Sequence, residues 1–522
     1  MDNEDEKHDC LKSRNVNKGD IYEDGNAVEN KQTWACAWFM KFKTDKHYSR
    51  KLLKTVLLFW TFAGLGWMTG QIGPSFPDLQ LVVEQTLDTA SWLFTIYSFG
   101  YMAGSFAGGL LYDHFSKSLV IAFSTMIMAV TTVALPWCRW FALMLAVRFL
   151  SGVGAGGLDT GANAYVMSFW GEKARSYIQG LHFCFSFGGI ISPLTTEPFL
   201  AKRLCQRLND KNESDAESSP NSTWTTHVPK DYVENDCKEP GYGPTYVHFA
   251  YLISFFVILS TSVPFFVIFV KEIMRTYKSP NIAEVNITEQ QEQKGEEQPR
   301  TMNKFSKKVQ TLILILLSLF MMIYCAVEDT FSSFLATFCI SYFGWGKDIS
   351  SYATSVFWFA FAVGRFLAIF IVKRFKPVNL LMIYCISLII AFLGILTACF
   401  TSTTSLLWVS ISLAGFSMSL IFPSVYSWTE ESILQVTGKI SSLFVIAGSI
   451  GLIINPIVLG YLMDNMTPMW FVYLLLGKSC FTLLLIFVVI ALVKLCKKSD
   501  CCKNSGNAVE KEMVPLQSNI SN

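Results

Sequence analysis

The sequence predicts an all-α membrane protein with twelve transmembrane helices, arranged as two six-helix bundles that repeat each other. Three observations predict this fold class. Of 522 residues, 52% are hydrophobic and only 16% are charged, against roughly 25% in globular domains. Twelve apolar windows are long enough to cross about 30 Å of hydrocarbon. A charged, Gln-rich segment near 272–308 then divides these windows into six and six.

The predicted spans follow one another with short connections, except at two places. They cover residues 52–76, 90–112, 117–136, 140–168, 177–199, 245–270, 309–340, 349–372, 378–400, 404–430, 438–463 and 468–494. Lys and Arg gather in the loops and flanks of one side, whereas the short loops of the other side hold only Arg139 and Lys347. Because basic loops stay in the cytoplasm, both termini are expected there. The plasma membrane is the expected location of this multi-pass protein, and an internal membrane is the alternative.

The domain organisation follows from these spans. We expect a disordered cytoplasmic tail, an amino-terminal bundle, a cytoplasmic central loop, a carboxyl-terminal bundle and a second cytoplasmic tail, at residues 1–50, 51–271, 272–308, 309–495 and 496–522. The first fifty residues lack an apolar run, so no cleavable signal peptide is expected and the first span would direct membrane targeting.

A long polar loop at 200–244 is expected on the outside. It carries two glycosylation sequons, at Asn212 and Asn221, and the cysteines Cys205 and Cys237. Sequons and cysteines in one loop are typical of an outward-facing segment. A disulfide between the two cysteines and a pair of free thiols are equally compatible with the sequence.

Internal similarity indicates a duplicated six-helix unit. Gly188 and Pro193 in FGGIISP match Gly451 and Pro456 in IGLIINP at an offset of 263 residues. Similar offsets align Gly104 with Gly364, and Gly154 with Gly415. Parallel repeats around a central cavity are the architecture in which substrate binds near the midplane while the halves rock around it.

The fourth span carries the densest polar stripe. Its members fall within one narrow face at 3.6 residues per turn: Arg148, Gly152, Gly156, Asp159 and Asn163. A carboxylate in hydrocarbon is costly, so Asp159 is expected to couple a cation or bind hydroxyl groups. The alternative is a buried ion pair with Arg148 or Arg365 that fixes helix packing.

Two further spans offer ionisable candidates. His182 in the fifth span could bind solute or relay a proton, or it could be a satisfied interhelical donor. In the seventh span only one of Glu328 and Asp329 can face a cavity, and Glu328 is the candidate because Asp329 borders a polar stretch and could be solvated at the surface. A helix-end role remains the alternative for either carboxylate.

A sugar site combines groups that bind hydroxyls with flat aromatic faces. Gln71, Trp358 and Asn455 lie near predicted midplane or outer positions and supply both kinds. Membrane aromatics are most often interfacial or packing residues, which is the competing interpretation of Trp358.

Several function classes lack support in the sequence. The net charge of +2 leaves no large basic surface for nucleic acid. No P-loop, metal-binding Cys/His cluster or nucleophile–base constellation is recognisable, so neither an enzyme nor a bound cofactor is expected, apart from sodium as a coupling ion.

Particular segments resemble a known family. GGLLYDHFSK, with Gly109, Asp113 and Lys117, resembles a degenerate loop motif of the major facilitator superfamily. LDTGANAYVMSFWGE, QGLHFCFSFGGIISPL and YCAVEDTFSSFLATF resemble segments of its sodium-dependent glucose transporter 1 group, also called major facilitator domain-containing protein 4. The bacterial fucose permeases are similar at a greater distance. The resemblance is strong in spans 1 through 5 and thinner in the carboxyl-terminal half.

The resemblance implies a monosaccharide transporter in which Asp159 takes the place of a coupling glutamate of the fucose permeases. Two departures matter. Gly70 stands where those permeases have a second carboxylate, and His182 and Phe185 replace a glutamine and an asparagine. The resemblance therefore implies sodium coupling or uniport rather than proton symport, and leaves the sugar open.

The sequence thus predicts a secondary transporter of a glucose-like hexose, coupled to sodium and working by alternating access. Asp159 would sense the cation, and the sugar would contact Gln71, Asn163, His182, Glu328, Trp358 and Asn455. Structural or gating roles fall to Gly109, Asp113, Lys117, Arg148, Gly152 and Arg365. A uniporter, a carrier of another polar solute, and a receptor or scaffold are the alternatives, and the oligomeric state is not predicted.

Overall fold

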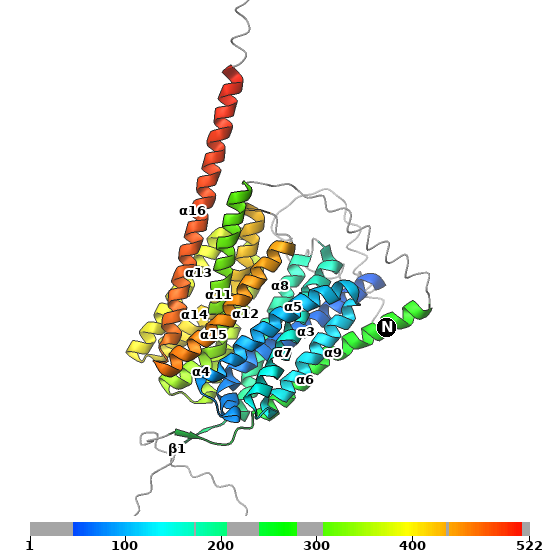
Figure 1. The fold of residues 1–522 in the computed structure, drawn as a ribbon, viewed down its shortest axis with the longest axis vertical. Coiled ribbons are helices and arrows are strands. Elements are labelled where there is room, and N and C mark those ends of the chain that lie inside the picture. The colour runs from blue at the N-terminus through cyan, green and yellow to red at the C-terminus, as the bar shows by residue number, and fades with distance from the viewer. Residues whose placement is uncertain (1–44, 172–173, 206–239, 279–305, 435–437, 514–522) are drawn as a thin grey trace, which may run out of the picture.

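The computed structural model describes residues 45–171, 174–205, 240–278, 306–434 and 438–513 (Figure 1). The sequons at Asn212 and Asn221 and the cysteine Cys237 lie outside these residues, as does most of the predicted central loop. The side chains of Asp113 and Cys205 also lie outside the description, so the loop motif and the disulfide stay predictions at these positions.

Twelve helices of 18 residues or more make up the described part of the chain. They are α3 (Lys46–Val83), α5 (Trp92–His114), α6 (Lys117–Ala134), α7 (Phe141–Trp170), α8 (Ala174–Thr196), α9 (Val247–Lys278), α11 (Lys307–Phe343), α12 (Lys347–Arg374), α13 (Pro377–Thr401), α14 (Thr404–Ser432), α15 (Gly438–Asn465) and α16 (Trp470–Met513). Short elements are α4 (Leu87–Ala90), the 3-10 turns η1 (Leu135–Trp137) and η3 (Glu197–Phe199), and the strands β1 (Arg203–Cys205) and β2 (Pro240–Tyr242).

Each predicted span coincides with one long helix, and the all-α prediction is confirmed. In the described chain nine helices are long and apolar enough to cross a membrane by length and composition. The three others, α5, α8 and α12, carry more small and polar residues. Each of them packs across the interface between the two halves, α5 on α15 and α8 on α12.

The helices form two groups side by side, one from α3 to α9 and one from α11 to α16 (Figure 1). The antiparallel β1–β2 ribbon, which the sequence did not predict, lies at one end of the bundle. We call this the ribbon end; it includes Val83 of α3 and Phe343 of α11. The opposite tail end includes Lys46 and Lys307, and α16 extends beyond it.

Glycines bring neighbouring helix backbones into contact. A Cβ atom added at Gly152 of α7 would lie 2.1 Å from the carbonyl oxygen of Tyr97 on α5. One added at Gly156 would lie 2.0 Å from that of Tyr101. No larger side chain fits such spaces, so the glycine stripe predicted in the fourth span is a packing seam between α5 and α7.

The two halves repeat these contacts. Gly188 on α8 meets the carbonyl oxygen of Ala63, and Gly451 on α15 meets that of Met322, at 2.0 and 1.9 Å from the added Cβ. The predicted match of Gly188 with Gly451 is therefore a match of contacts as well. The pairing of Gly154 with Gly415 needs correction.

The contact partner of Gly415 is the carbonyl oxygen of Phe357 on α12, at 2.4 Å from the added Cβ. The corresponding contact in the first half is that of Gly152 with Tyr97, whereas Gly154 faces Ser124 of α6. Gly152, two residues before Gly154, is thus the structural equivalent of Gly415.

These seams predict that Gly188→Ala and Gly451→Ala both destabilise the protein. Overpacking of this kind costs about 1–3 kcal/mol, and the expected result is a lower melting temperature of each purified variant. Gly477→Ala on α16 is the matched control, because nothing lies within 4 Å of its added Cβ. Equal melting temperatures for all three variants would contradict the close backbone packing at Gly188 and Gly451.

Candidate functional site

Asp159 lies on α7 with its carboxylate hydrogen bonded. The Tyr101 hydroxyl of α5 donates to its Oδ2, and the Asn163 amide donates to its Oδ1 at 3.0 Å and to its backbone oxygen at 2.9 Å. The structure therefore brings together Asp159 and Asn163, as the stripe predicted, and adds Tyr101. The described residues place no cation within 4 Å of Asp159, so the alternative of an ion pair with Arg148 or Arg365 is not realised.

Arg148 lies nearer the ribbon end, about 16 Å from Asp159 along the same helix. Its side chain is buried, and its guanidinium carbon lies 4.3 Å from the centroid of the Tyr97 ring. Its charge interacts with that of Asp329 on α11, in the other half. Asp329 is thus enclosed between the halves rather than solvated at the surface, which corrects the sequence-based reason for preferring Glu328.

Glu328 shares its environment with Arg365 of α12, whose charge interacts with it. The Arg365 guanidinium also lies 4.9 Å from the Phe361 ring centroid. His182 faces the same arginine from α8 and packs edge-on against the Phe62 ring, at 5.8 Å between centroids. Besides Asp159, the site thus contains two positive and two negative side chains: Arg148 of the amino-terminal half, and Arg365, Glu328 and Asp329 of the carboxyl-terminal half.

Gln71 of α3, Ser192 of α8 and Trp358 of α12 are buried polar side chains on three helices that cross and contact one another. Gln71 donates from Nε2 to the Thr196 hydroxyl at 3.2 Å, but its Oε1 has no hydrogen-bond partner among the described residues. The Ser192 hydroxyl and Nε1 of Trp358 also have no hydrogen-bond partner among the described residues. Gly70 and Gly189 make this crossing possible.

A Cβ atom at Gly70 would lie 2.6 Å from Ser192 Oγ, and one at Gly189 would lie 2.7 Å from the Trp358 ring. A buried polar group without a partner costs about 1–3 kcal/mol. The polar groups of Gln71, Ser192 and Trp358 therefore keep hydrogen-bonding capacity that no described residue uses in this conformation.

Asn455 differs from Gln71 because both its amide nitrogen and its amide oxygen make hydrogen bonds to described residues. Its Nδ2 donates to the Thr330 hydroxyl and, at 3.3 Å, to the Ala326 carbonyl oxygen of α11. Its Oδ1 accepts from the ammonium of Lys478 on α16. The structure places Asn455 in a bridge between three helices, with three of its four hydrogen-bonding positions used, and adds a membrane lysine that the sequence analysis missed.

A buried ion pair closes the ribbon end. Asp78 of α3 accepts at Oδ1 from the Lys347 ammonium of α12, and at Oδ2 from the Thr245 hydroxyl and, at 2.8 Å, from the Ala201 backbone N–H. Asp78 is 0% and Lys347 7% exposed. The Tyr242 ring covers the ammonium, with its centroid 4.3 Å from Nζ. We call Asp78 and Lys347 the gate pair.

Other contacts between the halves lie at the same end. The rings of Phe76, Phe94 and Phe334 pack together, with centroids 4.7 to 5.7 Å apart. The Asp88 backbone N–H donates to Asp464, and the Thr95 hydroxyl donates to the Ile453 carbonyl oxygen at 2.8 Å. Hydrogen bonds, an ion pair and aromatic packing together join the two halves at the ribbon end.

The remaining motif residues lie toward the tail end. Lys117 Nζ lies 5.0 Å from the centroid of the Tyr112 ring and 5.8 Å from that of Tyr165. An added Cβ at Gly109 would meet only Thr160, at 3.9 Å. The structural or gating role of the loop motif stays a prediction.

Two helical halves with a polar, charged interface and a closed end are the features of a membrane transporter. The sequence profile of the Major Facilitator Superfamily matches residues 56–201 and 242–456, and the chain belongs to this family. It is accordingly a multi-pass membrane transporter and not an enzyme.

Relatives agree over most of the chain. The mouse protein called sodium-dependent glucose transporter 1A (Mus musculus) is 28% identical over 84% of this chain and 96% of its own length. The human sodium-dependent glucose transporter 1 (Homo sapiens) is 29% identical over 81% of this chain and 76% of its own length. Human major facilitator superfamily domain-containing protein 4A (Homo sapiens) is 24% identical over 79% of this chain and 86% of its own length.

Solved structures agree in fold. The inward open conformation of the xylose transporter XylE from E. coli superposes with a TM-score of 0.60, covering 85% of this chain and 96% of that one, at 13% identity. A structure of the nucleoside transporter NupG superposes with a TM-score of 0.56 over 85% and 99%, at 15% identity. The predicted two-bundle fold is therefore confirmed.

The gate pair predicts a strong coupling in a double-mutant cycle of Asp78→Asn and Lys347→Met. Each single variant leaves a buried group without its partner and should lose about 3–5 kcal/mol of stability. The double variant should lose less than the sum, by a coupling energy of about 0.5–3 kcal/mol, measured by thermal unfolding of purified protein. Additive effects would exclude the pair, and Asp348→Asn, an exposed neighbouring carboxylate, is the control.

Proposed function

We propose that this chain is a secondary active transporter of a glucose-like hexose, coupled to sodium and working by alternating access. The names of its relatives support the substrate class and the coupling ion. The observation in this chain that carries the proposal is the set of buried, unpartnered polar groups at the crossing of α3, α8 and α12.

A sugar suits that crossing because each hydroxyl both donates and accepts a hydrogen bond. Gln71 Oε1 accepts, Trp358 Nε1 donates, and the Ser192 hydroxyl does either. The flat ring of Trp358 adds an apolar face of the kind that sugar rings contact. His182 and Glu328 lie on the two surfaces that would line the cavity when the halves separate, and remain candidates for further hydroxyl contacts.

Sodium prefers oxygen ligands. The two carboxylate oxygens of Asp159 and the hydroxyl oxygen of Tyr101 lie together between α7 and α5, and the Asn163 amide nitrogen donates to the same carboxylate. In our proposal Asp159 binds the ion, and Tyr101 and Asn163 hold its carboxylate in place. Sodium bound there would neutralise a charge whose burial is otherwise costly. In our proposal the ion therefore binds before the halves rearrange.

The positive-inside rule supports an orientation with the tail end in the cytoplasm and the ribbon end outside. The described conformation is then closed to the outside by the gate pair. Transport requires the gate pair and the Phe76, Phe94 and Phe334 cluster to separate while the tail end closes. Both termini would be cytoplasmic, in the plasma membrane.

Asp159→Asn should abolish the difference between uptake in sodium and uptake in choline, because the amide keeps the size of the carboxylate but not its charge. Uptake of labelled glucose by cells expressing equal surface amounts of each variant measures this. Asp348→Asn, which removes an exposed carboxylate, should leave the sodium dependence intact.

Unchanged sodium-dependent uptake in Asp159→Asn would refute its coupling role. Uptake by the unaltered chain that is indifferent to sodium would replace symport with uniport. No glucose uptake at all would move the substrate to another polar solute, which a panel of labelled solutes in the same cells would identify.

Gln71→Leu should weaken sugar binding, whereas Asn455→Leu should destabilise the protein. Gln71 has an unused acceptor, so its loss should raise KM for the sugar about two- to tenfold, the equivalent of about 0.5–1.5 kcal/mol for one hydrogen bond. Asn455 bridges Thr330 and Lys478, so its loss should lower the melting temperature and the amount of folded protein. A large KM change in Asn455→Leu at normal stability would restore Asn455 to the sugar site.

A further inference from the structure

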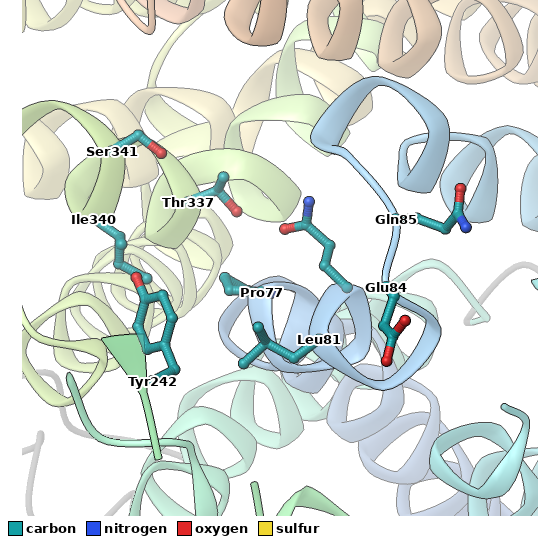
Figure 2. Close-up of a pocket in the computed structure, with 9 residues that line it drawn as sticks. Pro77, Leu81, Glu84, Gln85, Tyr242, Thr337, Ile340 and Ser341 are labelled. Carbon is teal, nitrogen blue, oxygen red and sulfur yellow. The ribbon is translucent and has the colours of Figure 1, made fainter. Parts of the chain in front are cut away.

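A pocket opens at the ribbon end, between the last turns of α3 and α11. Its volume is about 320 Å³, close to the lower limit of small-molecule sites. Figure 2 shows Thr337 and Ile340 of α11 facing Pro77 and Leu81 of α3, with Tyr242 of β2 beside them. The pocket is separate from the crossing of α3, α8 and α12.

The walls of this pocket combine hydrogen-bonding groups with an aromatic ring. Its polar members are Gln80, Glu84, Gln85, Thr337, Ser341 and Tyr242. Thr337 is 4% exposed, and its hydroxyl has no hydrogen-bond partner among the described residues. An unpaired buried hydroxyl costs about 1–3 kcal/mol, so a ligand that reached this hydroxyl would recover a hydrogen bond.

The size and the chemistry of the walls favour a neutral polyhydroxylated ligand over a single ion. A water molecule occupies about 30 Å³, so the pocket holds roughly ten, far more than one ion needs. Amides and hydroxyls bond with a ligand that both donates and accepts, and the Tyr242 ring offers a flat face. Apolar side chains of Pro77, Leu81 and Ile340 complete the lining, as in other small-molecule sites.

The pocket exists only while the halves are together at this end. One wall belongs to the amino-terminal half and the other to the carboxyl-terminal half, and its Tyr242 ring also covers the ammonium of Lys347 in the gate pair. A ligand that contacts both walls binds the closed gate better than the open gate. Such a ligand must therefore stabilise the closed state.

We propose that this pocket is an external site for a sugar or similar polyol, whose occupation holds the outer gate closed and so limits uptake at high external concentration. The proposal rests on the proposed function only for the orientation and the sugar class. The rate of uptake should rise with external glucose and then fall. In Thr337→Val and in Gln80→Leu it should rise to a plateau without falling.

A labelling assay that does not depend on transport tests the pocket independently of the proposed transport function. Ser333→Cys places a thiol on α11 beside Gly73, whose added Cβ would lie within 3.2 Å of the Ser333 carbonyl oxygen, behind the closed gate. Its labelling by a membrane-impermeant maleimide requires the gate to open. Added D-glucose or sorbitol should slow labelling, about twofold at a concentration equal to the dissociation constant, with the unaltered chain as the blank.

Variants of the pocket residues test whether the polyol protects Ser333→Cys from labelling by binding in this pocket. Thr337→Val or Gln80→Leu in the Ser333→Cys background should remove the protection, whereas Gln71→Leu and Thr397→Val, an exposed threonine of α13, should keep it. Labelling that is indifferent to both polyols, or protection that survives in both pocket variants, would overturn the proposal. Protection that depends on the pocket in a protein that takes up no glucose would support the pocket and refute the proposed function.

Discussion

Close approach of helix backbones at glycine is the constraint on which the rest of the structure depends. In lipid there is no hydrophobic drive between helices, so packing contacts and small residues decide which helices meet. Here Gly152 and Gly156 set α7 on α5, and Gly188 sets α8 on α3. Gly70 and Gly189 then bring Ser192 and Trp358 to the same crossing as Gln71. Larger residues there would push apart the groups that we assign to the sugar.

The distribution of charge follows from the same tight packing. A charge buried in a membrane protein needs a counter-charge or a hydrogen-bond partner. Asp159 uses neutral donors, whereas Arg148 and Asp329 interact from opposite halves and Arg365 and Glu328 interact within one half. An interaction between halves changes when they move, and an interaction within one half does not. Arg148 and Asp329 are therefore the charges that a conformational change affects most.

Much of the fold could be predicted because its determinants are local in sequence. Hydrophobic length fixed the helices, and the repeated Gly188 and Gly451 segments indicated the duplication. Asp159 and Asn163 were accessible because they lie one turn apart on one helix. Partners from distant helices were not accessible in this way. Tyr101, Asp78 and Lys478 were missed, since each acquires its importance from a side chain on another helix.

Lys347 is a residue whose tertiary partner could not be predicted from the sequence. From the sequence it is a basic residue in a short loop and serves only to orient the chain. In the structure it is the first residue of α12 and is buried against Asp78. The same limit applied to Asn455, where a free amide was expected and Lys478 occupies it. Composition and spacing identify which groups are costly in lipid, but the tertiary fold decides which of them are already satisfied.

The gate pair also bears on the history of the chain. The contacts of Ala63 and Met322 align α3 with α11 at an offset of 259, and those of Tyr97 and Phe357 align α5 with α12 at 260. By these offsets Asp78 corresponds to Thr337, and Lys347 to Leu87. Neither partner of the ion pair has a charged counterpart in the other half. Because a duplication produces two halves of the same sequence, the Asp78–Lys347 pair marks a place where the two copies have since diverged.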